Sequence, residues 1–225
     1  MRHFEMEMND LKNRLMDMCG LVQEMIKTAV GGLANRDSKL FGTVFSLEEE
    51  VNVQEIVIDD KCLKLIALNQ PVGADLRFIT SAMKINSDLE RIGDEAVNIS
   101  EGVADLLKLP ELKPLIDIPK MSDIVQQMVA DSIRAFNTTD VELAKAMLIK
   151  DDEADELLRK IISGLKEFII KAPDFETVQR AVDLMFIARS LERIGDHATN
   201  ISEDVIFMAH GKDVRHPRSH VFKAE

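Results

Sequence analysis

The chain has 225 residues, enough for one large domain or two small ones, and a formal net charge of −12. Hydrophobic residues make up 46%, and the absence of Trp and Tyr together with only ten Gly favours an all-α protein. The acidic balance argues against nucleic acid as a partner, because phosphate contacts need clustered Lys and Arg. No segment approaches the roughly 18 apolar residues of a membrane helix, and residues 1–10 have no apolar signal core. We therefore expect a cytoplasmic protein without membrane insertion.

Three helices are predicted before residue 108. The first runs from about Leu11 to Leu33, where apolar residues alternate in steps of four and three, as on the core-facing side of an amphipathic helix. The second runs from about Lys39 to Leu68 and ends at Asn69-Gln-Pro71. The third begins near Ala74 and ends at about Leu107. Short turns between these helices favour an antiparallel bundle.

The third helix carries a stretch that occurs twice in the chain. Residues 89–103, LERIGDEAVNISEGV, are identical at twelve of fifteen positions to residues 191–205, LERIGDHATNISEDV. Such self-similarity, here at a spacing of 102 residues, indicates a duplicated structural unit. In both stretches the apolar residues form one stripe at about 100° per residue, so both are predicted as amphipathic helices.

The second unit repeats the order of the first. It has a fourth helix around Val125–Val129, a fifth from about Asp140 to Lys171, and a sixth from about Phe175 to His210. We therefore predict an all-α fold of two tandem, antiparallel three-helix bundles.

The boundary between the units is marked by three prolines within ten residues, a spacing that no helix tolerates: Pro110, Pro114 and Pro119. We place the bundles at residues 1–108 and 120–210, a Pro-rich linker at 109–119, and a C-terminal tail at 211–225. Cys19 and Cys62 have no counterparts in the other unit and form no C-x-x-C pair, so we interpret both as small buried residues.

Acidic residues of the third helix lie away from its apolar stripe. Glu90 and Asp94 face the far side, with Asn98 and Glu101 nearby. The ordinary interpretation is a solvated charged face. The second unit, however, keeps all four residues, as Glu192, Asp196, Asn200 and Glu203. Because two acids four residues apart repel each other unless a cation lies between them, we predict an oxygen-rich cation site in each unit.

A glycine accompanies the acid pair in both units. Gly93 and Gly195 lie in the middle of predicted helices, where glycine costs roughly 1 kcal/mol relative to alanine. A glycine in such a place suggests that another backbone or a ligand comes close.

The second helix supplies further oxygen ligands. Glu48, Asn52, Glu55 and Asp59 step by four, three and four, and so lie on one face; at a spacing of 103, Asp151 and Asp155 match the first two. Packed beside the third and sixth helices, these pairs would face one cavity, which suits Mg, Ca, Mn or Fe and suits zinc poorly. The predicted metal ligands are Glu48, Asn52, Asp59, Glu90, Asp94, Asn98, Asp151, Asp155, Glu192, Asp196 and Asn200.

Over nearly its whole length the chain resembles the PhoU family of phosphate-signalling regulators. The resemblance rests on the two Leu-Glu-Arg-Ile-Gly-Asp stretches, on Gln70–Arg77, on the duplicated three-helix unit and on Gly211–His216. It implies a cytoplasmic, often dimeric protein that restrains the phosphate-starvation response. It also implies two partners, the ATPase subunit of the phosphate ABC importer and a membrane sensor histidine kinase.

The resemblance also implies multinuclear metal clusters, one per bundle, held by E/D-x-x-x-D motifs, with Fe, Mn or Mg as the expected metals. In this chain the motif falls on Glu90 with Asp94, Asp151 with Asp155, and Glu192 with Asp196. Glu48 and Asn52 match it with an amide in place of one acid, and His197 replaces Glu95. The two sites are therefore expected to differ.

We expect a regulator without catalytic residues, and two alternatives stay open. A carboxylate-bridged di-iron enzyme needs Glu-x-x-His on inward-facing helix positions, which no predicted helix contains. A helical adaptor that binds no metal is distinguished from the first interpretation by its metal content. Because the chain has no Gly-rich phosphate loop, ATPase activity would belong to a partner.

Overall fold

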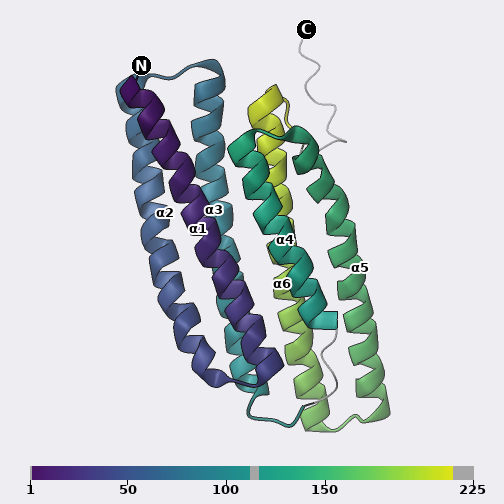
Figure 1. Ribbon diagram of the computed structural model, residues 1–225. Helices are drawn as coiled ribbons and strands as arrows, with labels where there is room; N and C mark the ends of the chain where they lie inside the picture. The colour runs from purple at the N-terminus through teal and green to yellow at the C-terminus, as the bar shows by residue number, and fades with distance from the viewer. Residues whose placement is uncertain (1, 112–116, 215–225) are drawn as a thin grey trace.

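Six long α-helices account for nearly all of residues 2–111 and 117–214, which are the residues that the computed structural model describes (Figure 1). No strand occurs among them, which confirms the predicted all-α fold. The helices are α1 (Arg2–Asn35), α2 (Phe41–Asn69), α3 (Gly73–Leu106), α4 (Asp117–Thr138), α5 (Val141–Lys171) and α6 (Phe175–His210), with a 3-10 turn, η1 (Ser38–Leu40), before α2.

The helix ends follow from local chemistry. The Asp140 side chain accepts a hydrogen bond from the backbone N–H of Leu143 (3.0 Å), and Asp174 caps α6 in the same way. Between α2 and α3 the chain reverses through Gln70, whose φ is 48°, and Gly73, whose φ is 59°. Helix α1 begins well before the predicted Leu11, and Phe4 in its first turns packs against the core.

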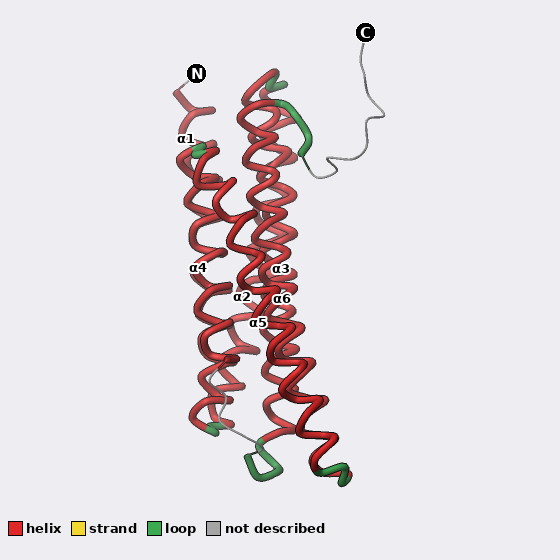
Figure 2. The backbone as a smooth tube through the Cα atoms, turned by 90° about the vertical axis from the view of Figure 1, so that its right-hand side faces the viewer, coloured by secondary structure: helices red, strands yellow, loops and turns green. Residues whose placement is uncertain are grey.

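The two predicted bundles are both present. Helices α1, α2 and α3 form one and α4, α5 and α6 the other, and all of them run along a common direction (Figures 1 and 2). The bundles meet mainly through α3 and α6, with a smaller contact between α1 and α4. Helices α3 and α6 are antiparallel, since Ser81 near the start of α3 contacts Asp204 near the end of α6.

The core consists of the apolar stripes predicted from the sequence and continues across both bundles. In α1 the fully buried residues are Leu11, Leu15, Met18, Val22, Met25, Ile26 and Ala29. The rings of Phe78 and Phe136 stack between α3 and α4 with their centroids 5.0 Å apart. Cys19 and Cys62 are free and buried, as expected, and burial raises the pKa of each thiol to about 12.

The connection between the bundles is held from both sides. The guanidinium of Arg36 donates to the carbonyl oxygens of Leu107 and Leu109, and that of Arg180 donates to Pro110 O at 2.8 Å. Helix α4 begins at Asp117, so Pro119 lies in its first turn, where a missing N–H leaves no helical bond unmade, rather than in the linker. Pro114 and residues 215–225 of the tail lie outside the described residues.

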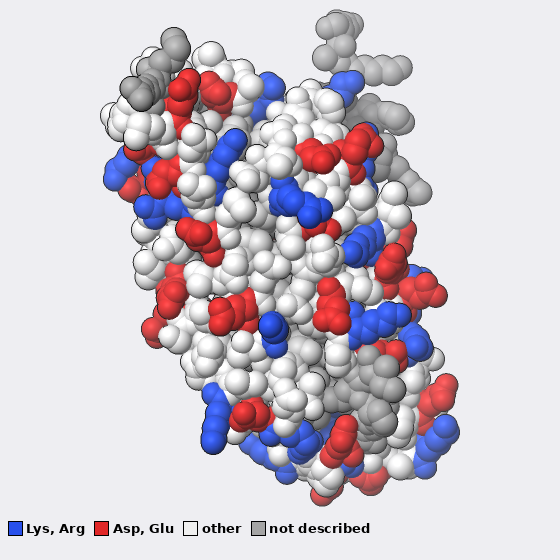
Figure 3. Space-filling view, viewed as in Figure 1, with Lys and Arg blue, Asp and Glu red and all other residues white. Residues whose placement is uncertain are grey.

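The surface carries charge of both signs. On the face formed by α1 and α4, acidic and basic side chains are interspersed, without a continuous basic patch (Figure 3). Within the part of the chain that the structure describes, no helix is both long enough and apolar enough to cross a bilayer.

Candidate metal centres

Four carboxylates gather between α5 and α6 in the second bundle. Asp151 and Asp155 come from α5, and Glu192 and Asp196 from α6. Burial raises the pKa of Asp151 to about 6, and repulsion from Asp196 and the other acids around it adds to this shift. Burial and then neighbouring carboxylates also raise the pKa of Glu192 and that of Asp196. The two predicted acid pairs therefore share one electrostatic environment.

Gly195 allows this close approach. A methyl group on its Cα would lie 3.3 Å from Asp151 Oδ1, tighter than an ordinary contact, so the bare backbone of α6 leaves room for the α5 carboxylate. In the first bundle, Gly93 faces the apolar side chains of Val51 and Met25, at 3.5 and 3.6 Å. The contact is tighter than an ordinary one only at Gly195, so only in the second unit does the repeated glycine bear on the acid cluster.

The first bundle has a corresponding cluster between α2 and α3. Burial, followed by repulsion from Asp94 and Glu55, raises the pKa of Glu90. Burial also raises the pKa of Glu48, with Asp94 and Glu101 as the next causes. Burial raises the pKa of Glu55 as well, and Asp59 and Asp94 add to it. Glu48, Glu55, Glu90 and Asp94 therefore influence one another as the four acids of the second bundle do.

The two clusters differ in where the second helix of the bundle places one carboxylate. Asn52, which is exposed, stands where the second bundle has Asp155 and removes one charge. Glu55, one turn further along α2, stands where the second bundle has the buried Leu158 and restores a carboxylate. The predicted ligand set contained Glu48, Asn52 and Asp59 but left out Glu55, although the sequence placed all four on one face of the helix.

Three other predicted ligands are engaged elsewhere. Asp59 accepts a hydrogen bond from Asn86 Nδ2 at 3.0 Å, and Asn98 donates to Glu95 Oε2 at 3.2 Å. Asn200 Nδ2 donates to Asp88 Oδ1 at 3.3 Å, across the contact between the bundles. These side chains flank the two clusters, while the carboxylates of Glu90, Asp94, Glu192 and Asp196 lie within them.

A second polar network joins α3 to α6, and the sequence did not predict it. His197 Nδ1 lies 2.8 Å from Asp88 Oδ1, Arg193 pairs with Glu95 at 3.2 Å, and Lys84 pairs with the buried Asp204 at 2.9 Å. The observed roles of His197 and Glu95 explain why the two units differ at this position, since each contacts the other bundle. A search for repeated residues cannot find such contacts, because they connect non-equivalent positions of the two units.

The donor set fits a cation that prefers oxygen. Carboxylates suit hard and borderline ions such as Mg²⁺, Mn²⁺ and Fe²⁺. Burial, followed by repulsion from neighbouring carboxylates, raises the pKa of Glu90 and that of Asp151, and a bound cation would offset both effects. Within residues 2–111 and 117–214, no three Asp, Glu, His or Cys side chains already stand at the spacing that one ion requires. Binding therefore requires the carboxylates to turn towards the ion.

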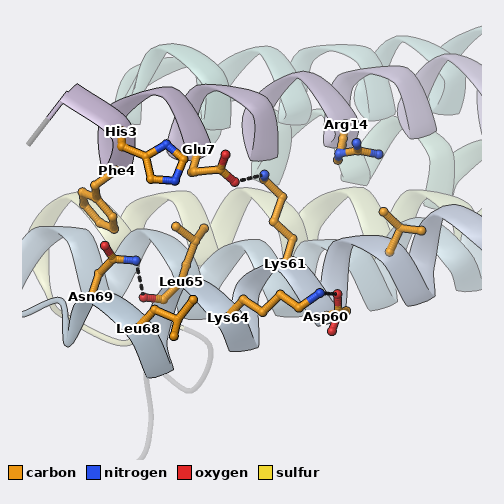
Figure 4. Close-up of a pocket in the computed structure, with 11 residues that line it drawn as sticks. His3, Phe4, Glu7, Arg14, Asp60, Lys61, Lys64, Leu65, Leu68 and Asn69 are labelled. Carbon is orange, nitrogen blue, oxygen red and sulfur yellow. Dashed lines mark hydrogen bonds and ion pairs between the residues drawn. The ribbon is translucent and has the colours of Figure 1, made fainter.

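A separate cavity of about 400 Å³ opens between the start of α1 and the end of α2 (Figure 4). Phe4, Leu65 and Leu68 line it together with charged residues. Lys61 from α2 bridges Glu7 and Asp10 of α1, so its charge is already compensated. None of the residues of the two acid clusters lines this cavity, and its paired charges hold α1 against α2.

Comparison with known proteins agrees with the two-bundle arrangement. The PhoU domain model matches twice, at residues 15–103 and 118–205. The phosphate-specific transport system accessory protein PhoU homolog of Aquifex aeolicus is 40% identical over 210 residues, which cover 93% of this chain and 94% of that protein. The crystal structure of PhoU from Pseudomonas aeruginosa has a TM-score of 0.88 at 33% identity and covers 93% of this chain and 100% of that one. For the phosphate transport system regulatory protein PhoU from Streptococcus pneumoniae, the TM-score is 0.83 at 28% identity, over 94% of this chain and 99% of that one.

Proposed function

Because this chain belongs to the PhoU family, we propose that it is a metal-binding regulator of phosphate uptake and a negative regulator of the phosphate-starvation response. Two of the similar proteins are named as an accessory protein and as a regulatory protein of a phosphate transport system, which supports this role. In the proposed scheme the chain acts in the cytoplasm as a homodimer without catalytic activity. It links the ATPase subunit of the phosphate ABC importer to a sensor histidine kinase.

The observation that carries the metal-binding part is the presence of two acid clusters at equivalent places. Each lies between the second and third helices of its bundle. Burial, followed by repulsion from neighbouring carboxylates, raises the pKa of Glu90 in the first cluster and the pKa of Glu192 and of Asp196 in the second. A solvated charged face does not bring four carboxylates from two helices together, because their repulsion opposes the fold.

The second cluster would hold metal through Asp151, Asp155, Glu192 and Asp196. The first would use Glu48, Glu55, Glu90 and Asp94, with its flanking amides and Asp59 outside them. When bound, Fe, Mn or Mg, alone or as a multinuclear cluster, supplies the positive charge that these acids lack. With that charge in place, α2 is held to α3 and α5 to α6, which fixes the surfaces that partners meet.

Reporter expression in cells that lack this protein tests the regulatory role. Without the protein, phosphate-regulated genes should be expressed even when phosphate is plentiful, and the wild-type chain should restore repression. The variant Glu192→Ala/Asp196→Ala should fail to restore it, while Glu153→Gln, at an exposed position of α5, should succeed. Unchanged expression in the cells without the protein would refute the regulatory role, and full repression by the double variant would refute the need for the metal centre.

A further inference from the structure

A cavity of about 640 Å³ lies between the two bundles, at the end of the molecule where α1 begins and α6 ends (Figure 1). Its walls come from the starts of α1 and α3 in the first bundle and from the ends of α4 and α6 in the second. It is distinct from the cavity of Figure 4, which lies between α1 and α2. The large apolar residues of its walls, which suit an apolar side chain, are Phe4, Met8, Phe78 and Met208.

An equivalent cavity at the opposite end of the molecule is almost filled, with only about 20 Å³ of open space. The segment that follows α3 occupies it, since Pro110 and Glu111 form part of its walls. The repeat relates the two cavities, because three wall residues correspond at spacings of 102 and 103: Leu106 with Met208, Arg180 with Phe78, and Arg36 with Thr139. The same place in the repeat is thus filled at one end and open at the other.

Cationic side chains hold the segment that fills the small cavity. Arg36 and Arg180 donate to its backbone carbonyl oxygens. The large cavity offers donors of the same kind on its half-buried walls. Lys12 Nζ lies 5.1 Å from the centroid of the Phe78 ring, and Arg77 binds the end of α6 through Nε and carries further N–H donors on the same guanidinium. A stretch of polypeptide with a large apolar side chain therefore fits this cavity.

The segment that follows α6 starts beside this cavity. Gly211 ends α6 with a φ of 68°, and a methyl group on its Cα would lie 3.9 Å from Cδ of Arg77 in the cavity wall. After Val214 the sequence continues, outside the described residues, as RHPRSHVFKAE at 215–225. Fully extended, the chain from Gly211 to Phe222 spans up to about 36 Å, so the Phe222 side chain can reach any part of the cavity.

Charge favours this segment as the occupant. Two exposed acids, Glu5 and Asp75, belong to the walls of the cavity. Residues 215–225 carry three basic side chains, Arg215, Arg218 and Lys223, against one acid, whereas the whole chain has a net charge of −12. Opposite charge therefore draws this segment towards the acidic remainder of the chain.

We propose that residues 215–225 dock into this cavity of their own chain, with the Phe222 side chain among Phe4, Met8 and Phe78. Docking ties the end of α6 to α1 and α3. Each end of the contact between the bundles is then covered by the segment that follows α3 or α6. The contact is independent of the proposed metal centres and of the partners of the proposed function.

A tryptophan at residue 222 reports on the docking, because the chain has no Trp or Tyr of its own. In full-length Phe222→Trp, acrylamide should quench the fluorescence several-fold less than that of free tryptophan amide, and the emission should lie at shorter wavelength. Both values should be independent of protein concentration, because the cavity belongs to the same chain. Quenching equal to that of free tryptophan amide, or protection that appears only as concentration rises, would overturn the proposal.

Substitutions in the cavity wall show whether the cavity protects this reporter. Adding Glu5→Lys/Ala74→Arg, which reverses one charge and adds bulk at two exposed wall positions, should raise the quenching several-fold with unchanged helicity. Adding Glu153→Lys/Glu156→Lys, at exposed positions of α5, should leave the quenching unchanged. Equal protection in the two variants would mean that residue 222 lies elsewhere.

A disulfide shows which chain supplies the occupant. Both native cysteines are buried, so a mild oxidant should link the new thiols of Met8→Cys/Phe222→Cys within one chain, and the product should have the mass of a single chain. Glu153→Cys/Phe222→Cys should not link. Absence of a link in the first variant, or a product of two chains, would contradict the proposal. These assays use no importer, kinase or metal, so their failure leaves the reporter-gene test of the regulatory role unaffected.

Discussion

Asp151 is the carboxyl group on which burial and repulsion act together most strongly. Folding raises its pKa from 3.8 to about 6. Between these two values the folded chain binds more protons at this site than the unfolded chain does, so the free energy of unfolding falls as pH rises. Below about pH 4, Asp151 is protonated in both the folded and the unfolded chain and does not destabilise the fold. As pH rises from about 4 through about 6, the charged form becomes increasingly costly in the folded chain, and the free energy of unfolding falls. At neutral pH the metal-free protein therefore carries an unfavourable charge at this site.

Replacing Asp151 by Asn should remove this pH dependence. Between about pH 5 and pH 7.5, with a chelator present, wild type should lose about 1 kcal/mol more stability than Asp151→Asn, after allowance for solvent screening. Urea unfolding at the two pH values measures the difference. Glu153→Gln, an exposed neutral substitution on the same helix, should behave as wild type does. Equal pH dependence in wild type and Asp151→Asn would show that ionisation of Asp151 does not destabilise the folded chain.

Gly195 offers a separation of metal binding from stability. Ala at this position gains up to about 1 kcal/mol of helix propensity, but its methyl group presses on Asp151 Oδ1 at 3.3 Å. Gly195→Ala should therefore weaken binding of Mn²⁺ severalfold without lowering the melting temperature, as titration calorimetry and thermal unfolding can measure. Gly93→Ala meets only apolar side chains at ordinary contact distance and serves as the control. Equal weakening by both would mean that the contact with Asp151 is irrelevant.

At the scale of the element, the sequence predicted what each helix does within its own bundle. The stripes from Leu11 to Ala29 and from Ile85 to Val103 are buried, because apolar spacing reports directly on the face that packs. The acid pairs were predicted to converge, and in the structure Glu55 and Asp94 lie near enough to add to the effect of burial on the pKa of Glu90, as Asp196 and Asp155 do for Asp151. Repetition supplied this information, since the same side chains recur where the local geometry recurs.

Contacts between the bundles were not predictable in this way. Asp88 corresponds to Ser190 in the second unit, and Asp204 to Gly102 in the first. A comparison of the two units therefore does not single out either acid, because neither is repeated. Gly102 has a packing role of its own, since a methyl group there would lie 3.2 Å from Ile187 Cγ1. Only the antiparallel crossing of α3 and α6, which no local pattern encodes, brings these residues together.

The contact between α3 and α6 depends on Asp88, which is 8% exposed and is contacted by both His197 and Asn200. Asp88→Ala removes the acceptor from both and should lower the free energy of unfolding by about 1–3 kcal/mol, because buried polar groups lose their partner. Ser190→Ala, at the equivalent position of the second unit, should cost less than about 1 kcal/mol. Urea unfolding compares the two variants. An unchanged free energy of unfolding in Asp88→Ala would show that apolar packing alone joins the bundles.

At the scale of the whole molecule, the two bundles share some features and differ in others. The equivalent helix pairs α2–α3 and α5–α6 both have an acid cluster, while the polar residues with which α3 and α6 contact each other differ between the two units. A regulator needs both properties. Under the proposed function, equivalent acid clusters would let both bundles respond to a cation, and unlike surfaces would let different partners be distinguished.

Elemental analysis of the purified protein tests the central claim, that the paired carboxylates are a metal centre. Protein prepared without chelators, or incubated with Fe or Mn, should contain bound metal. The variant Glu192→Ala/Asp196→Ala should lose part of the bound metal, and adding Glu90→Ala/Asp94→Ala should remove the rest. Helicity should be preserved in both variants, and Glu153→Gln should bind as much metal as wild type. Wild-type protein that holds no metal after incubation with either ion would contradict the account and leave a helical adaptor.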